Sequence, residues 1–285
     1  MCAAPVISAT ELAAEINNPR LRLFDCRFLL KNTEKGEQLY NNSHLPNAQY
    51  LHLDRDMSSE ITENTGRHPL PDRDGFRELL MSKGVSDDSL VVVYDSNQGA
   101  IAGRCWWLAR WIGLKDVRIL DGGLHAWAEI EQSMSKEVPV YEPGQISVVP
   151  DAMPVTQMDE IARIAAGDSD RILVDARDND RFAGQTEPLD PVAGHVPTAF
   201  NAPFDRNMDD EGYFLPVDTL RERFMHFVEK VDGAEKVVHM CGSGVTACNN
   251  IIAMELAGLS GSSMYPGSWS EWITDPKNPV ATEID

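Results

Sequence analysis

Long apolar runs are missing from this 285-residue chain. The longest candidate, from Ala100 to Leu114, is interrupted by Arg104 and Arg110, whereas a membrane-spanning helix needs about 18 or more largely apolar residues in succession. The amino-terminal residues also lack the basic segment followed by an apolar segment that marks a secretory signal. We therefore expect neither a membrane span nor a signal peptide.

Positive charge is scarce. Lysine and arginine together number 25 against 45 aspartates and glutamates, which gives a formal net charge of −20. Nucleic acid and anionic membrane surfaces repel such a chain, and no cluster of basic residues offsets the repulsion locally. Neither is expected as a partner, and a site for a small anion would need its own basic residues.

Cysteine is also sparse, and its pattern argues against a C-x-x-C redox site and against a zinc site. The five cysteines are Cys2, Cys26, Cys105, Cys241 and Cys248. Their number is odd, and neither a C-x-x-C pair nor a Cys/His cluster with zinc spacing is present. Without a signal peptide, this indicates free thiols in a reducing cytoplasm and no structural zinc.

The remaining composition is that of a globular protein. Apolar residues make up 42% and charged residues 25% of the chain, with 20 glycines and 17 prolines, so disordered and collagen-like classes are excluded. A chain of this length typically folds into two domains, each long enough to bury its own core.

Five short segments recur in the same order in the two halves of the chain, at offsets of about 150 residues. The pairs are Leu23–Arg27 with Leu173–Arg177, His44–Ala48 with His195–Ala199, Leu70–Pro71 with Leu215–Pro216, Val92–Asp95 with Val238–Cys241, and Asp121–Trp127 with Pro266–Trp272. This order indicates the tandem duplication of one domain.

Each half alternates short β-branched runs with helical patterns, which predicts an α/β fold with a mainly parallel sheet flanked by helices. Strands are expected at 90–94, 171–174 and 236–240, and helices at 10–16, 104–112, 156–166 and 246–257. The proline-rich stretch from Ser133 to Pro154 suits a linker with one strand near Ile146–Val149. We expect domains at 1–134 and 151–285, joined by a linker at 135–150.

The clearest candidate site follows the expected strand at 236–240. Cys241 opens a loop that contains Gly242 and Gly244 and runs into a helix. Glycines let several backbone N–H groups face inward, and the helix N-terminus adds positive potential, so a cysteine here would have a lowered pKa and act as a nucleophile. The alternative is a buried structural thiol. The first half carries Asp95 at the equivalent position, so only the second half could be catalytic.

The sequence of residues 241–247, Cys-Gly-Ser-Gly-Val-Thr-Ala, resembles the active-site loop of the two-domain rhodanese-type sulfurtransferases, and most closely that of the 3-mercaptopyruvate sulfurtransferases. The Asp-Gly-Gly…Trp and His-x-Pro-x-Ala segments are similar to family signatures, and the resemblance covers essentially the whole chain. It implies tandem rhodanese-like domains, of which the first is silent because it has Asp95 at the cysteine position.

The resemblance implies sulfur transfer by a ping-pong route. Cys241 would take a sulfur atom from 3-mercaptopyruvate or thiosulfate, and its persulfide would pass that atom to cyanide, a small thiol or thioredoxin. Ser243 would polarise the donor carbonyl in a relay with His68 and Asp54. The other residues expected to bind substrate are Arg181, Gly242, Gly244, Val245 and Thr246. No cofactor or metal is implied, and one tandem chain is expected to act as a monomer.

A donor carboxylate needs a cation, preferably a guanidinium. Arg181 matches the first of two substrate arginines in the family, but the second stands in a Glu-Pro-Arg triplet that is here Glu187-Pro188-Leu189. Arg67, next to His68, is a candidate for the missing charge. The loop carries no basic residue, which favours the monoanion mercaptopyruvate over the dianion thiosulfate.

Three alternatives are weighed against this prediction. A thiosulfate-preferring rhodanese would share the site but is typically marked by a basic loop. A rhodanese-fold phosphatase would need an arginine six residues after the cysteine, where Ala247 stands. A non-catalytic sulfur carrier or binding module would not need to keep Cys241, Ser243 and Arg181, although Leu189 favours it.

Structural roles are expected for several other polar and aromatic residues. Asp25 with Arg27 and Asp175 with Arg177 are expected to form ion pairs at strand ends. The expected loop anchors are His44 and His195, and the expected packed side chains are Trp106, Trp107, Trp111, Cys248, Trp269 and Trp272.

Overall fold

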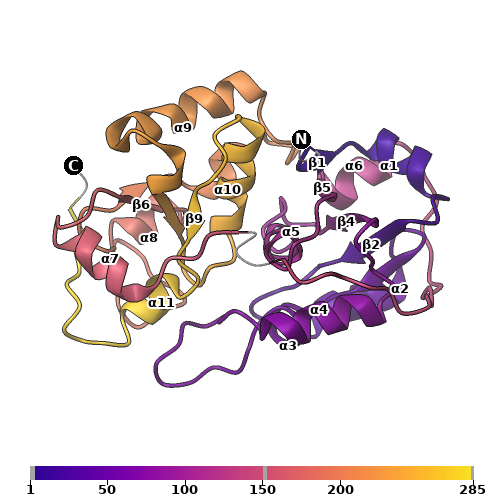
Figure 1. The fold of residues 1–285 in the computed structure, drawn as a ribbon, viewed down its shortest axis with the longest axis horizontal. Coiled ribbons are helices and arrows are strands. Elements are labelled where there is room, and N and C mark those ends of the chain that lie inside the picture. Colours follow the sequence, from indigo (N-terminus) through magenta and orange to yellow (C-terminus); the bar gives the residue numbers. More distant parts are fainter. Residues whose placement is uncertain (1–3, 150–152, 284–285) are drawn as a thin grey trace. The chain divides into compact units, whose positions relative to one another are not determined.

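A computed structural model describes residues 4–149 and 153–283 (Figure 1). The described residues form two compact units. The first unit comprises those up to Ser59, those of Leu70–Met153 and those of Asp209–Phe214, and the second comprises Glu60–Pro69, Pro154–Met208 and the chain from Leu215 on. The domain limits at 134 and 150 stay predictions.

The first unit is built on a five-stranded sheet in the order β1-β5-β4-β2-β3, with every paired strand parallel. Its strands are β1 (Val6–Ile7), β2 (Leu21–Asp25), β3 (Ala48–Tyr50), β4 (Leu90–Tyr94) and β5 (Val117–Leu120). Its helices are α1 (Ala9–Glu15), α2 (Lys35–Asn42), α3 (Leu53–Asp56), α4 (Arg73–Ser82), α5 (Ala102–Trp111) and α6 (Gly123–Glu129).

Local sequence explains these elements. Ser8 and Glu11 form a reciprocal capping box that begins α1. The run Leu90–Tyr94 is buried at every position, as expected of a central parallel strand covered on both faces. Helix α5 packs against β4 and β5 and is buried over most of its length.

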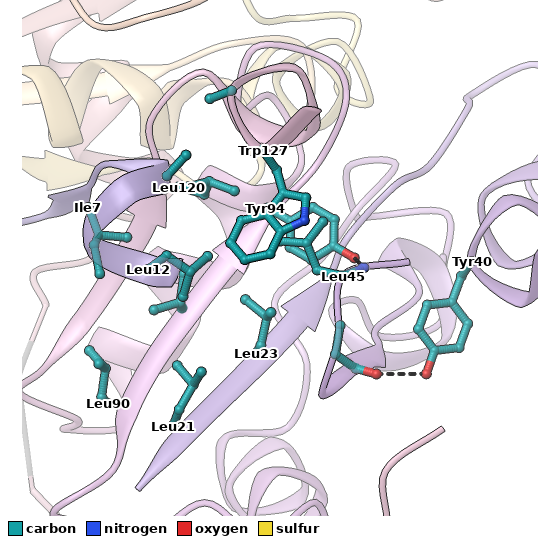
Figure 2. Close-up of a cluster of buried hydrophobic side chains, with 14 residues drawn as sticks. Ile7, Leu12, Leu21, Leu23, Tyr40, Leu45, Leu90, Tyr94, Leu120 and Trp127 are labelled. Carbon is teal, nitrogen blue, oxygen red and sulfur yellow. Dashed lines mark hydrogen bonds between the residues drawn. The ribbon is translucent and has the colours of Figure 1, made fainter. Parts of the chain in front are cut away.

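The core of the first unit gathers aliphatic and aromatic side chains from β2, β4 and the flanking helices (Figure 2). Trp127 lies within it and is 1% exposed. The buried hydroxyl groups are bonded: Tyr40 donates to the carbonyl of Ala48 at 2.9 Å, and Tyr94 accepts the N–H of Leu45 at 3.1 Å (Figure 2). Bonded hydroxyls let these tyrosines enter an apolar core at little cost.

The second unit repeats the plan with a four-stranded parallel sheet in the order β7-β6-β8-β9. Its strands are β6 (Ile172–Asp175), β7 (Phe200–Asn201), β8 (Val237–Met240) and β9 (Ser263–Met264). Its helices are α7 (Met158–Ala165), α8 (Asn179–Phe182), α9 (Val217–Val231), α10 (Ala247–Leu256), α11 (Ser268–Trp272) and the 3₁₀ turns Phe204–Asn207 and Ala234–Lys236. Helix α10 packs on β8 and β9, and α7 packs on β6.

The expected α/β class and the parallel sheets are confirmed, and the predicted strands and helices lie within two residues of those observed. The strand predicted near Ile146–Val149 is wrong. There the backbone bonds to a turn rather than to a strand: Asp87 N–H donates to Gln145 O at 3.0 Å, and Ser147 N–H donates to the Asp87 carboxylate at 2.9 Å.

The structural roles expected of several polar residues are confirmed. Arg27 and Arg177 each bond the aspartate two residues before them through Nε and Nη2, with shortest contacts of 2.6 and 2.7 Å. His44 Nδ1 lies 2.7 Å from the carbonyl of Tyr40, and His195 Nδ1 lies 2.8 Å from that of Phe182. The two halves thus share these local structures as well as their sequence.

The expected packed side chains also lie in cores. Trp106, Trp107, Trp269 and Trp272 are fully buried, and Trp111 is partly buried. Of the five cysteines, Cys26, Cys105, Cys241 and Cys248 are free and buried, and Cys2 lies outside the described residues. Within 4–149 and 153–283, no helix is long and apolar enough to cross a membrane.

Candidate active site

The cysteine loop begins where β8 ends, at the carboxyl edge of the second sheet. Cys241 directly follows Met240, which pairs with Asp175 of β6, and the loop closes at Ala247, the first residue of α10. The thiol is buried, with 2% of the residue exposed. Gly244 has φ +72°, and a Cβ there would lie 2.3 Å from the carbonyl oxygen of Pro266, so this turn requires glycine.

The recurrent segment Pro266–Trp272 holds this loop in place. Cys241 N–H donates to the hydroxyl of Ser268 at 3.1 Å, and Trp269 N–H donates to the Cys241 carbonyl at 3.0 Å. Ser270 N–H donates to the Gly242 carbonyl at 2.9 Å. The sequence indicated that this segment recurs, but its role as a support for the loop emerges only from the fold.

The loop favours the thiolate form of Cys241 over the thiol. Burial by itself raises the pKa of Cys241, but hydrogen bonds from the Thr246 side chain and from the N–H groups of Ser243 and Ala247 lower it more. The pKa of this buried thiol therefore lies below its ordinary value. Hydrogen bonding to the charged form is the physical basis of a reactive thiol at this position.

We expect Thr246→Val to slow the reaction of Cys241 with iodoacetamide near neutral pH about tenfold, by removing one of the bonds that lower its pKa. The midpoint of the alkylation rate against pH should move upward in the variant. Thr274→Val is the matched control, because its hydroxyl is on the surface and bonds only the carbonyl of Glu271 at 2.8 Å in the described structure. Equal midpoints in the two variants would contradict the assignment.

The first unit shows the same kind of loop with a carboxylate in place of the thiol. Asp95 accepts hydrogen bonds of 2.8 to 3.0 Å from the N–H groups of Asn97, Gly99, Ile101 and Ala102. Its carbonyl accepts the N–H of Leu124 at 2.9 Å, as that of Cys241 accepts the N–H of Trp269. Burial raises the pKa of Asp95 and these N–H groups oppose that rise, so this loop of the repeated domain turns its backbone donors toward the side chain at this position.

His68 and Ser243, which the family resemblance implies to act together, are in contact. Nδ1 of His68 lies 2.7 Å from the hydroxyl oxygen of Ser243, and each residue is 6% exposed. His68 is in the segment Glu60–Pro69 of the second unit. Asp54 is an exposed residue of α3 in the first unit, so its part in a relay stays a prediction.

Arg181, on α8, is tied to two buried carboxylates. Its Nε and Nη2 bond Glu187 at 2.7 to 3.2 Å, and Nη2 also lies 3.2 Å from Asp190. The carboxylates of Glu187 and Asp190 are 4% and 3% exposed. Leu189, which stands where the resemblance implies a second arginine, is 38% exposed, and its N–H donates to Glu187.

Arg67 brings a second guanidinium to the loop. Its Nη1 forms an ion pair with Asp190, and its N–H donates to the hydroxyl of Ser270 at 3.0 Å. A Cβ built on Gly242 would lie 2.8 Å from Nη2 of Arg67 and 3.5 and 3.6 Å from Nη2 and Nη1 of Arg181. Two cationic groups therefore lie beside the residue that follows Cys241, and a side chain at position 242 would force the guanidinium of Arg67 to shift.

The pKa of Arg67 reflects this setting. Burial lowers it, the charge of Cys241 raises it, and the neighbouring Arg181 lowers it again. The coupling to Cys241 places the guanidinium within the electrostatic reach of the thiolate. The sequence indicates Arg67 only as a candidate. Glu187 and Asp190 could not be predicted as partners of the arginines, because nothing in their spacing shows which cations they bind.

The remaining predicted residues line the turn. Val245 is 6% exposed and Thr246 is partly exposed, beside Gly242 and Gly244. No three His, Cys, Asp or Glu side chains of the described chain gather in a way that could hold a metal ion. The site therefore combines a thiol of lowered pKa, surrounded by hydrogen-bond donors of its own loop, with two arginines next to it.

Comparison with known proteins gives the family. The rhodanese-like domain model matches residues 8–130 and again 158–275. A probable 3-mercaptopyruvate sulfurtransferase of Pseudomonas aeruginosa is 42% identical over 99% of both chains, and a putative thiosulfate sulfurtransferase, SseB, of Mycobacterium tuberculosis is 35% identical over 96% of both. The solved 3-mercaptopyruvate sulfurtransferase of Leishmania major matches 94% of this chain and 73% of its own, at 29% identity and a TM-score of 0.82. The chain belongs to the rhodanese family, as a two-domain sulfurtransferase.

Proposed function

We propose that this enzyme transfers a sulfur atom from 3-mercaptopyruvate, through a persulfide on Cys241, to a thiol acceptor. The observation that supports it best is the buried Cys241, whose pKa is lowered by its own loop, with two guanidiniums beside Gly242. The relatives named for this donor and for thiosulfate share the activity class.

The first half-reaction is an attack by the Cys241 thiolate on the sulfur of the donor. A sulfur–sulfur bond forms, the carbon–sulfur bond of the donor breaks, and its electron pair passes to the enolate of pyruvate. Ser243 would donate its hydroxyl hydrogen bond to the developing oxyanion, with His68 holding that hydroxyl at 2.7 Å. Protonation of the enolate carbon then gives pyruvate.

The second half-reaction returns the enzyme to its thiolate. An acceptor thiolate attacks the outer sulfur of the persulfide, and the Cys241 thiolate leaves, stabilised by the bonds that lower its pKa. A small thiol, thioredoxin or cyanide would serve as acceptor. We further propose that the enzyme acts as a cytoplasmic monomer, in accord with its free thiols and its two tandem domains.

Thiosulfate is the second candidate donor. The relative named for thiosulfate is 35% identical, and both donors would form the same persulfide. The cysteine loop carries no basic residue, and the nearby arginines are paired with buried carboxylates, so a dianion would find less uncompensated positive charge than it needs. This charge balance favours the monoanion 3-mercaptopyruvate.

The intact mass of the protein after incubation with each donor tests the proposal. Native protein should gain one sulfur atom from 3-mercaptopyruvate, faster than from thiosulfate, and release it on addition of a thiol. Cys241→Ser should gain none, whereas Cys248→Ser, which removes another buried thiol, should behave as the native protein does. No gain from either donor would overturn the proposal and favour a binding module.

A further inference from the structure

Two guanidinium nitrogens beside Gly242 are left for a ligand. Asp190 binds Arg67 through Nη1, while Glu187 and Asp190 bind Arg181 through Nε and Nη2. In the described structure no hydrogen bond engages Nη2 of Arg67 or Nη1 of Arg181. These two nitrogens lie 2.8 and 3.6 Å from the Cβ position of Gly242, so both flank the residue next to the nucleophile.

We propose that Arg67 is the second residue that binds the acidic group of the sulfur donor, a role that the uncharged Leu189 cannot fill. Asp190 is then the counter-ion of the two arginines, and its charge makes the site favour a donor group with one negative charge over a group with two. This inference rests on the proposed function for its donor, but the anion site itself can be tested without sulfur transfer. One nitrogen from each guanidinium would bind one oxygen of a carboxylate.

The surroundings of Arg67 hold it ready for this role. Its side chain is 28% exposed, so a donor can reach it, while Asp190 binds the guanidinium and the hydroxyl of Ser270 accepts the backbone N–H. Pairing with a buried carboxylate orders a long side chain before substrate arrives, which lowers the entropic cost of binding. Leu189, with 38% of its surface exposed and no charge, offers nothing comparable.

The charges near the loop explain the limit to one negative charge. Three arginines, Arg67, Arg177 and Arg181, face three carboxylates through the ion pairs described above; the carboxylates belong to Asp175, Glu187 and Asp190. This cluster is neutral before the thiolate forms. A monoanion then gains two directed hydrogen bonds and meets the repulsion of the thiolate once, whereas a dianion gains the same two bonds and is repelled about twice as strongly.

Alkylation of Cys241 by iodoacetate and by neutral iodoacetamide isolates recognition of the carboxylate. In both reactions the thiolate attacks the methylene carbon and iodide leaves, so a change in the pKa of Cys241 alters both rates alike. The rate with iodoacetate divided by the rate with iodoacetamide, both followed at Cys241 by peptide mass, should fall about tenfold in Arg67→Gln. In Arg67→Lys, which keeps the charge but loses the forked guanidinium, this ratio should fall less.

Arg163→Gln is the matched control, because Arg163 lies on the surface of α7 and pairs with Glu160. Its rate ratio should equal that of the native protein. Asp190→Asn should raise the ratio and should also raise kcat/KM for thiosulfate relative to 3-mercaptopyruvate, since one negative charge is removed. An unchanged alkylation ratio in Arg67→Gln, measured on folded protein, would overturn the inference even if sulfur transfer is confirmed; a tenfold fall with no persulfide from either donor would sustain the anion site and overturn the proposed function.

Discussion

Replacing Gly244 with alanine is expected to lower the free energy of unfolding by about 3 kcal/mol and the rate of sulfur transfer at least ~100-fold. Its backbone has φ +72°, where a side chain costs about 1 kcal/mol. The added Cβ would also lie 2.3 Å from the carbonyl oxygen of Pro266 and 3.0 Å from the next two Pro266 atoms. These are backbone and ring-bound atoms, so the loop itself must shift, and with it the donors around Cys241.

Gly167→Ala separates the two causes. Gly167 follows α7 with φ +76°, and a Cβ there meets nothing within 4 Å. Its substitution should cost only about 1 kcal/mol, with sulfur transfer unchanged. Urea unfolding and the rate of persulfide formation measure both effects in both variants. If Gly244→Ala loses no more stability or activity than Gly167→Ala, the close approach to Pro266 is not what requires glycine.

Much of the fold could be predicted because its signals are local. The buried run Leu90–Tyr94 and the equivalent run before Cys241 mark the central strands, and the recurrence of five segments gives two copies of one domain. The apolar run near Ile146–Val149 misled, because hydrophobicity alone does not provide a neighbouring strand. Instead, the N–H of Ser147 donates to the carboxylate of Asp87, and that of the preceding Gln145 donates to the hydroxyl of Ser86.

The site could be predicted only as far as it is continuous in sequence. Cys241, Ser243 and Thr246 share one loop, and the loop's glycines predict its conformation. By contrast, the ion pair of Arg67 with Asp190 joins residues 123 positions apart. No periodicity or spacing connects them, and the partner of a cation is decided by which carboxylates the fold buries beside it.

The duplication offers an internal comparison that a single domain lacks. Asp25 with Arg27 and Asp175 with Arg177 form the same buried pair at the end of equivalent strands. Only the second pair lies near the proposed nucleophile: Asp175 raises the pKa of Cys241, and Arg177 also pairs with Glu187 at 3.4 Å. A change in stability and a change in reactivity can therefore be separated by making the same substitution in each half.

Asp175→Asn and Asp25→Asn are each expected to lower the free energy of unfolding by about 3 kcal/mol, because each leaves a buried arginine without its bidentate carboxylate. Only Asp175→Asn should also move the midpoint of iodoacetamide alkylation of Cys241 to lower pH, since the carboxylate that raises that pKa is removed. Denaturant unfolding and the pH dependence of alkylation measure the two effects. A shift of equal size in both variants would mean that general loosening of the fold, rather than the charge of Asp175, governs the thiol.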